Sequence, residues 1–153
     1  MKKDIFIDGE TGTTGLQVHE KLSKHPNVSI MSVDQSKRKD ISYKKEMLAK
    51  SDVTFLCLPD ETSIETAQIA DELGDKSPII IDASTAHRTN PKWSYGLPEL
   101  GENYRKSIEN SKRIASPGCY STGANVILKP LISNGILSKN IPKQKIFSLS
   151  KIS

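Results

Sequence analysis

The chain has 153 residues, with 22 Lys or Arg against 18 Asp or Glu and a formal net charge of +4. This length suits one compact domain whose core requires no disulfide or metal ion, and we predict no metal site. The N-terminus lacks a signal-peptide core, and the best apolar run, VTFLCLP, is about a third of the ~20 residues of a membrane span, which excludes membrane insertion. Two cysteines fit reduced thiols in a cytoplasmic protein. The basic excess lacks an aromatic platform or nucleic-acid motif, which favours a solvated surface or a small anionic ligand over nucleic acid.

Apolar runs and helix-compatible segments alternate along the first half of the chain. We expect strands at residues 2–8, 28–33, 52–59 and 77–84, with helices between them at residues 13–25, 42–50 and 61–74. In the last of these helices Thr62 and Glu65 form a capping box, and Gly74 ends the pattern. Its apolar residues recur at every third position: Ile64, Ala67, Ala70 and Leu73. Continuous apolar strands between helices indicate a parallel sheet covered on both faces, the α/β doubly wound class.

The pattern is looser after residue 86. Residues 87–106 are rich in Pro, Gly and Asn and predict a long loop with an embedded short helix. A short strand at residues 112–116 and an apolar helix from Cys119 follow, and residues 143–153 begin like a strand.

A glycine-rich segment, GETGTTG, joins the first strand to the first helix. A dinucleotide pyrophosphate binds at such a junction because glycine permits the tight turn and the close approach of phosphate to backbone N–H groups. The spacing is G-x-x-G-x-x-G where the usual fingerprint is G-x-G-x-x-G, so a helix that merely starts with glycines is the alternative. The residues expected to contact the cofactor here are Gly9, Thr11, Gly12, Thr13, Thr14 and Gly15.

The segment after the second strand bears on the choice of nucleotide. Asp34 favours the ribose 2′-hydroxyl of NAD, whereas basic residues accommodate the 2′-phosphate of NADP. The candidate phosphate-binding residues outnumber the single carboxylate: Ser36, Lys37, Arg38 and Lys39. We therefore expect NADP, bound through Ser36, Lys37 and Arg38, with a solvated turn as the alternative.

Cys119 lies in the segment SPGCYSTGANVILKPLI, where the first turn of a helix is expected. The thiolate is the nucleophilic form of cysteine, and a helix N-terminus favours it through unpaired N–H groups and the positive dipole end. Gly118 permits close approach of a ligand. The apolar residues expected to anchor the helix are Val126, Ile127, Leu131 and Ile132. The alternative is a buried small hydrophobic residue, which is what we expect of Cys57 inside its apolar strand.

Five motifs together resemble one family. GETGTTG, FLCLPD (55–60), IIDASTAHRT (80–89), YGLPEL (95–100) and SPGCYSTGA (116–124) are similar, in this order, to N-acetyl-γ-glutamyl-phosphate reductase, and SVDQSKRKD (32–40) resembles its shorter type. The resemblance implies that Cys119 attacks an acyl phosphate and forms a thioester. It further implies that NADPH reduces the thioester, which yields N-acetyl-glutamate 5-semialdehyde.

The resemblance also implies where the cofactor lies and what the chain does not contain. Pro59, Ser84, Thr85 and Gly118 are the expected further cofactor-binding positions. Residues 1–115 are expected to form the Rossmann-type NAD(P)-binding domain, and residues 116–153 the cysteine helix and the start of a second, catalytic domain. The three histidines match no catalytic histidine of the family, and the substrate-binding residues are not among these 153.

Three readings therefore remain open. The chain is the amino-terminal portion of such a reductase, which is a homo-oligomer when complete; or a free-standing, non-catalytic NADP-binding module; or a relative of aspartate-semialdehyde dehydrogenase, which resembles the family in its glycine loop and cysteine.

Overall fold

The computed structural model describes residues 2–137 and shows an α/β fold around one sheet in the order β2-β1-β3-β4-β6-β5. All strand pairings are parallel. The strands are β1 Lys3–Asp8, β2 Val28–Ile30, β3 Val53–Leu56, β4 Ile79–Asp82, β5 Ser94–Tyr95 and β6 Arg113–Ala115. The α-helices are α1 Thr13–Ser23, α2 Ile41–Lys50, α3 Asp60–Asp71, α4 Glu102–Glu109 and α5 Cys119–Ser133, and the 3-10 helices are η1 Gln35–Lys37, η2 Gly74–Lys76 and η3 Pro98–Leu100. The predicted doubly wound α/β class is confirmed.

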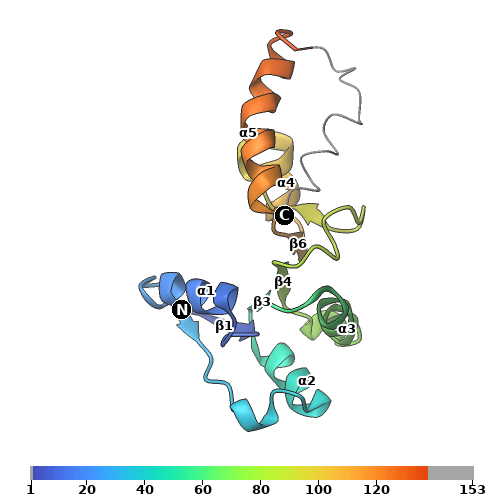
Figure 1. Cartoon of the computed structure of the whole chain (residues 1–153). Helices are drawn as coiled ribbons and strands as arrows, with labels where there is room; N and C mark the ends of the chain where they lie inside the picture. Colours follow the sequence, from blue (N-terminus) through green and yellow to red (C-terminus); the bar gives the residue numbers. More distant parts are fainter. Residues whose placement is uncertain (1, 138–153) are drawn as a thin grey trace.

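The first helices lie on opposite faces of the sheet. The chain steps outward from β1 to β2 and then returns past β1 to β3, so right-handed connections place α1 and α2 on different faces. Figure 1 shows α1 and α2 on either side of β1, and α2 contacts α3. The same figure shows α5, in orange, extending away from the sheet.

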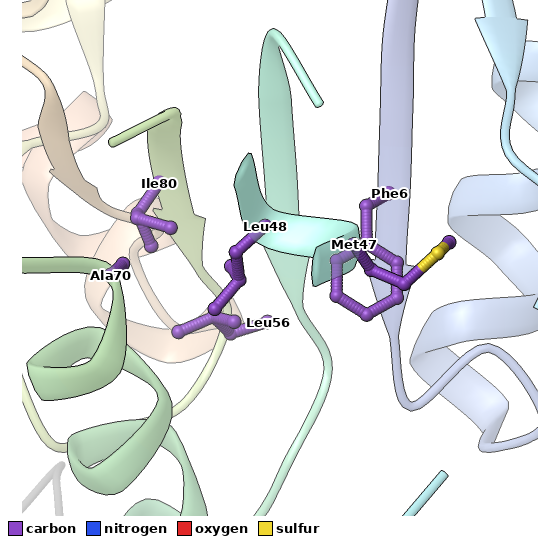
Figure 2. Packing of buried hydrophobic residues seen from close by; sticks show 6 residues of the cluster. All are labelled: Phe6, Met47, Leu48, Leu56, Ala70 and Ile80. Atoms are coloured by element: carbon purple, nitrogen blue, oxygen red, sulfur yellow. The ribbon is translucent and has the colours of Figure 1, made fainter. Parts of the chain in front are cut away.

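The hydrophobic core lies between the sheet and the pair α2 and α3. Its cluster is formed by Phe6, Met47, Leu48, Leu56, Ala70 and Ile80 (Figure 2). Leu48, Leu56 and Ile80 have no exposed surface. Because full burial of a Leu or Ile side chain contributes about 1.5–3 kcal/mol, these contacts hold α2 and α3 firmly against β1, β3 and β4.

The carboxyl ends of the central strands form one row. Asp8 of β1 pairs with Leu56 of β3, and Leu56 pairs in turn with Asp82 of β4. Asp82 then pairs with Ala115 of β6. Three spacings of ~4.8 Å make this row roughly 14 Å wide. The loops that follow these residues therefore start side by side at the edge where parallel α/β sheets bind ligands.

Helix α3 begins earlier than predicted. It starts at Asp60, directly after Pro59, and no side-chain cap bond is formed, so the capping box of Thr62 and Glu65 is wrong. The acidic residues Asp60 and Glu61 occupy the first turn, where their negative charges stabilise the helix by interaction with the positive end of its dipole. The buried face is Ser63, Thr66, Ala67 and Ala70, whereas the predicted Ile64 is 40% exposed.

The second half of the described chain departs from prediction in two places. The predicted loop at residues 87–106 contains β5, which pairs with β6 and extends the sheet, and its helix is α4. The expected anchoring of α5 is wrong for Val126 and Ile127, which are 50% and 64% exposed, and α5 has no buried residue. Within residues 2–137 no helix is long and apolar enough to cross a membrane. The strand expected at residues 143–153 lies outside the described residues.

Candidate active site

The glycine loop between β1 and α1 is shaped by two close backbone approaches. Gly9 has φ +89°, and a Cβ there would lie 2.3 Å from the carbonyl oxygen of Cys57. A Cβ on Gly15 would lie 2.2 Å from the carbonyl oxygen of Gly9. Gly12 is the N-cap of α1 and provides no side-chain cap, so the N–H groups of the first helical turn are available to a phosphate.

A pocket of ≈ 240 Å³ lies beside this loop, at the ends of β1, β2 and β3. Of the predicted cofactor residues it brings together Gly9, Thr11 and Arg38, and it adds Lys39. The other lining residues are Phe6, Ile7, Asp8, Glu10, Val33, Gln35, Tyr43, Lys44, Leu58 and Thr62. The predicted residues of the glycine loop and of η1 that do not line it are Gly12, Thr13, Thr14, Gly15, Ser36 and Lys37. An apolar pocket with a few charged groups suits the adenosine end of a dinucleotide.

The polar groups at the start of η1 form hydrogen bonds within this segment. Asp34 accepts hydrogen bonds from the backbone N–H and the hydroxyl of Ser36, at 3.0 and 2.7 Å. The Ser36 hydroxyl bond, followed by the Ser36 N–H bond, lowers the pKa of Asp34. Lys37 lies 3.9 Å from the Asp34 carboxylate and does not line the pocket. Arg38 and Lys39 are therefore the cations of this segment that face the pocket.

A buried ion pair on the wall of the pocket was not predicted. The Nζ atom of Lys44 lies 2.8 Å from Asp8 Oδ2 and 3.1 Å from Thr66 Oγ1. Only 12% of the Lys44 side chain and 10% of the Asp8 side chain are exposed. This ion pair could not be predicted from the sequence, because Lys44 is one of three lysines in α2 and lysine side chains are usually exposed to solvent.

The loops after β3 and β4 are joined by hydrogen bonds to carboxylates. Thr85 donates both its backbone N–H and its hydroxyl to Asp60, and these bonds lower the pKa of Asp60. Ser84 donates its N–H and hydroxyl to Asp82. Pro59 is the N-cap of α3. The predicted wall residues Ser84 and Thr85 therefore shape the loops, with their donors already in use.

Cys119 is exposed and is the first residue of α5, with Gly118 as the N-cap. The guanidinium of Arg88 lies against this turn: its Nε donates to the carbonyl of Ser116 at 3.0 Å, and its Nη2 donates to the carbonyl of Ala83 at 3.1 Å. A Cβ at position 118 would lie 2.8 Å from Nη1 of Arg88. Arg88 was not predicted, although it lies within the motif DASTAHR.

Cys57 has the surroundings of a residue that stays a thiol. It is half-buried, and burial, followed by the charges of Asp8 and Asp82, raises its pKa to about 11. The prediction of a buried residue inside a strand is met only in part, because Cys57 directly follows β3 and is half-buried. The thiolate is the nucleophile, so Cys119 is the better candidate of the two.

The histidines have distinct settings. His19 of α1 lies 3.2 Å from the Glu10 carboxylate, and His25 accepts a hydrogen bond from the N–H of Asn27. His87 is buried, with Nδ1 2.6 Å from Asp82 Oδ2. Among residues 2–137 no group of three or more His, Cys, Asp or Glu side chains could hold a metal ion.

Curated proteins with known names are similar to this chain over almost its whole length. N-acetyl-gamma-glutamyl-phosphate reductases from Brucella ovis and Brucella anthropi are each 40% identical to it over 142 residues, which is 93% of this chain and 45% of each relative. The chain thus spans about half the length of the curated relatives it matches.

Solved structures show the same architecture. Aspartate semialdehyde dehydrogenase II from Vibrio cholerae has a TM-score of 0.65 at 19% identity, over 88% of this chain and 43% of that one. Aspartate semialdehyde dehydrogenase with NADP from Candida albicans has a TM-score of 0.64 at 16% identity, over 88% and 48%. The family model "Semialdehyde dehydrogenase, NAD binding domain" matches residues 4–110, the segment that contains the glycine loop and the pocket. The chain belongs to the semialdehyde dehydrogenase NAD-binding domain family.

Proposed function

We propose that this chain is the cofactor-binding and nucleophile-bearing portion of an N-acetyl-γ-glutamyl-phosphate reductase that uses NADPH. The observation that carries the proposal is the exposed Cys119 at the start of α5, directly after Gly118, against which the Arg88 guanidinium lies. The relatives at 40% identity bear this name. In this proposal residues 1–115 form the nucleotide-binding domain and residues 116–153 begin the catalytic domain.

The row of strand ends provides the place for the cofactor. The free N–H groups at the start of α1 suit the pyrophosphate, and the neighbouring pocket suits the adenosine. Arg38 and Lys39 are the cations for the 2′-phosphate. Ser84, Thr85 and Gly118 follow the strand ends further along the row and would hold the nicotinamide end. NADPH, when bound there, supplies a hydride.

Cys119 acts as the nucleophile in the proposed reaction. Its thiolate sulfur forms a bond to the acyl carbon of N-acetyl-glutamyl 5-phosphate, and the bond from that carbon to the phosphate oxygen breaks, so inorganic phosphate leaves. Hydride from NADPH would reduce the thioester carbon to a thiohemiacetal on Cys119, which would release N-acetyl-glutamate 5-semialdehyde and return the thiol. Covalent catalysis divides one difficult reduction into easier steps.

Arg88 suits the departing phosphate. A guanidinium has five N–H donors, and the hydrogen bonds to Ser116 and Ala83 use one from Nε and one from Nη2. Its Nη1 makes no hydrogen bond within residues 2–137 and lies against Gly118, the residue before the nucleophile. Arginine binds phosphate through such planar, charge-assisted donors. We therefore assign Arg88 to anion binding beside Cys119.

Acylation of the chain tests this proposal. Intact-mass spectrometry after incubation with N-acetyl-glutamyl 5-phosphate is expected to show one added N-acetylglutamyl group, which peptide mapping places on Cys119. Cys119→Ser removes the adduct, whereas the matched control Cys57→Ser retains it. A folded parent chain that gains no adduct would refute the proposal and favour the non-catalytic module. Faster acylation by aspartyl 4-phosphate would favour the aspartate-semialdehyde alternative.

A further inference from the structure

Asp82, the last residue of β4, is the centre of a buried hydrogen-bond network. It has no exposed surface. Its carboxylate accepts the backbone N–H of Ser84 at 2.9 Å, the hydroxyl of Ser84 at 2.7 Å and the Nδ1–H of His87 at 2.6 Å. Its backbone carbonyl also accepts the N–H of Ser116 at 2.7 Å. One residue therefore holds both the loop after β4 and the turn that leads to Cys119.

The His87 ring is fixed from its edge and from its face. The edge is held by the bond to Asp82, and the face stacks on Trp93 with ring centroids 3.9 Å apart and planes inclined by 12°. Only 7% of His87 is exposed. A phenyl ring could make the same stack without a buried polar atom. The histidine therefore adds the hydrogen bond to Asp82, and buried polar groups carry a cost unless they are paired.

Arg88 follows His87 directly in the chain. Its side chain bridges the carbonyls of Ala83 and Ser116 and lies against Gly118. Ser84 and His87 both donate hydrogen bonds to the Asp82 carboxylate, so the backbone of the loop that carries Arg88 is fixed at two points. When the His87 ring is held, the direction in which the Arg88 side chain leaves the loop is held as well.

We propose that the Asp82–His87 hydrogen bond is a positioning device for Arg88 and, through it, for the environment of Cys119. His87 and Asp82 are positioning residues that act on the site without touching the substrate. The inference rests on the proposed function, because it takes Cys119 as the nucleophile and Arg88 as its cationic neighbour. Reactive cysteines lie in electropositive surroundings, and the Arg88 guanidinium lies against Gly118, the residue before Cys119, so displacement of Arg88 slows the reaction of that thiol.

Iodoacetamide tests the inference on the chain as it is. The alkylation rate of Cys119 is followed by peptide mapping, which separates it from Cys57, and the unfolding midpoint is measured in parallel. His87→Phe keeps a flat ring over Trp93 and removes the bond to Asp82; His87→Asn keeps a donor near the Nδ1 position and removes the stack. His25→Phe, outside the site, is the matched control.

We expect the substitutions at His87 and at Arg88 to be non-additive, because both slow alkylation by removing the Arg88 guanidinium from its place. His87→Phe slows alkylation of Cys119 about tenfold, the size of one hydrogen bond to a charged group. His87→Asn retains most of the parent rate, and His25→Phe leaves it unchanged. Arg88→Gln is also slow, and His87→Phe combined with Arg88→Gln is no slower than Arg88→Gln alone.

Three outcomes would overturn the inference. The first is a His87→Phe rate equal to the parent rate; the second is a greater loss in His87→Asn than in His87→Phe, which would assign the role to the stack. The third is a double variant whose rate loss is the product of the single losses. If His87→Phe does not fold, His87→Gln replaces it, since its amide lies beyond the Nδ1 position. An unchanged rate in Arg88→Gln would overturn this inference and the Arg88 assignment, while acylation of Cys119 still decides the proposed function.

Discussion

Lys44 is held at the wall of the pocket beside the glycine loop by Asp8 and Thr66, with little exposed surface. Removal of one partner from such a pair leaves a buried charge without compensation. We predict that Lys44→Met lowers the free energy of unfolding by about 3–5 kcal/mol, measured by urea denaturation.

The matched control is Lys45→Met on the same helix, because the ion pair of Lys45 with Glu72 is exposed and contributes little. Addition of Asp8→Asn to Lys44→Met removes the stranded charge and should recover part of the loss. A Lys44→Met chain as stable as Lys45→Met would show that the pair does not stabilise the fold.

Arg38 and Lys39 face the pocket, whereas Lys37 lies by Asp34. We predict that Arg38→Glu combined with Lys39→Glu weakens NADPH binding at least about tenfold more than NADH binding, because only NADPH has the 2′-phosphate. Fluorescence titration with each nucleotide measures this ratio. Lys37→Glu is the control and should change the ratio less; the opposite order would assign the 2′-phosphate to Lys37.

Residues whose position follows from the local backbone could be predicted from the spacing of glycines and apolar residues along the sequence. Gly9 and Gly15 could be recognised because a turn before a helix requires glycine. The position of Cys119 at the start of a helix could be recognised because it begins an apolar run after Pro-Gly. The contacts of Arg88 and Lys44 could not, since Arg88 bonds carbonyls in the loops after β4 and β6, and Lys44 bonds residues of β1 and α3, which a single sequence does not bring together.

The connection between β1 and α1 leaves no room for a side chain at Gly15. A Cβ on Gly15 would meet backbone atoms of Gly9 and Glu10 at 2.2 and 2.7 Å, which side-chain motion cannot relieve. We predict that Gly15→Ala lowers the melting temperature and abolishes NADPH binding. The control is Gly123→Ala in α5, where a Cβ meets nothing within 4 Å, so the better helix former stabilises the chain slightly. Equal melting temperatures for the two variants would contradict the close approach at Gly15.

Elements with long apolar runs were predictable, and those set by tertiary contacts were not. The strands β1, β3 and β4 follow from continuous apolar runs. β5 has two residues, Ser94 and Tyr95, which carry no apolar pattern and become a strand only by pairing with β6. The start of α3 was misplaced because Pro59, and not Thr62, is the N-cap of the helix. The exposed apolar face of α5 shows that an apolar pattern predicts a helix without saying what covers it.

The half-buried position of Cys57 makes the stability of the fold depend on pH in the alkaline range. Burial, with Asp8 and Asp82, holds its pKa at about 11 in the folded chain, above the ordinary value of 9.0. Folding thus favours the thiol: this contribution is fully present below pH 9 and is lost as the pH rises through 11. Urea denaturation of the parent and Cys57→Ser between these pH values should show a steeper loss for the parent, and parallel curves would refute the shift.

For the whole molecule, the position of the site could be predicted from its topology. Parallel strands place Asp8, Leu56, Asp82 and Ala115 in one row, so the motifs that follow them were bound to meet at one edge. The sequence did not predict how the row is divided. The structure shows a pocket at the ends of β1 and β2, hydrogen-bonded loops after β3 and β4, and the turn with Cys119 after β6.

Titration of the chain with NADPH and with NADH measures whether this row of strand ends binds NADPH. We predict saturable binding of NADPH at one site, tighter than NADH by about tenfold or more because of the 2′-phosphate. The absence of binding by the folded chain, or equal affinity for the two nucleotides, would contradict it.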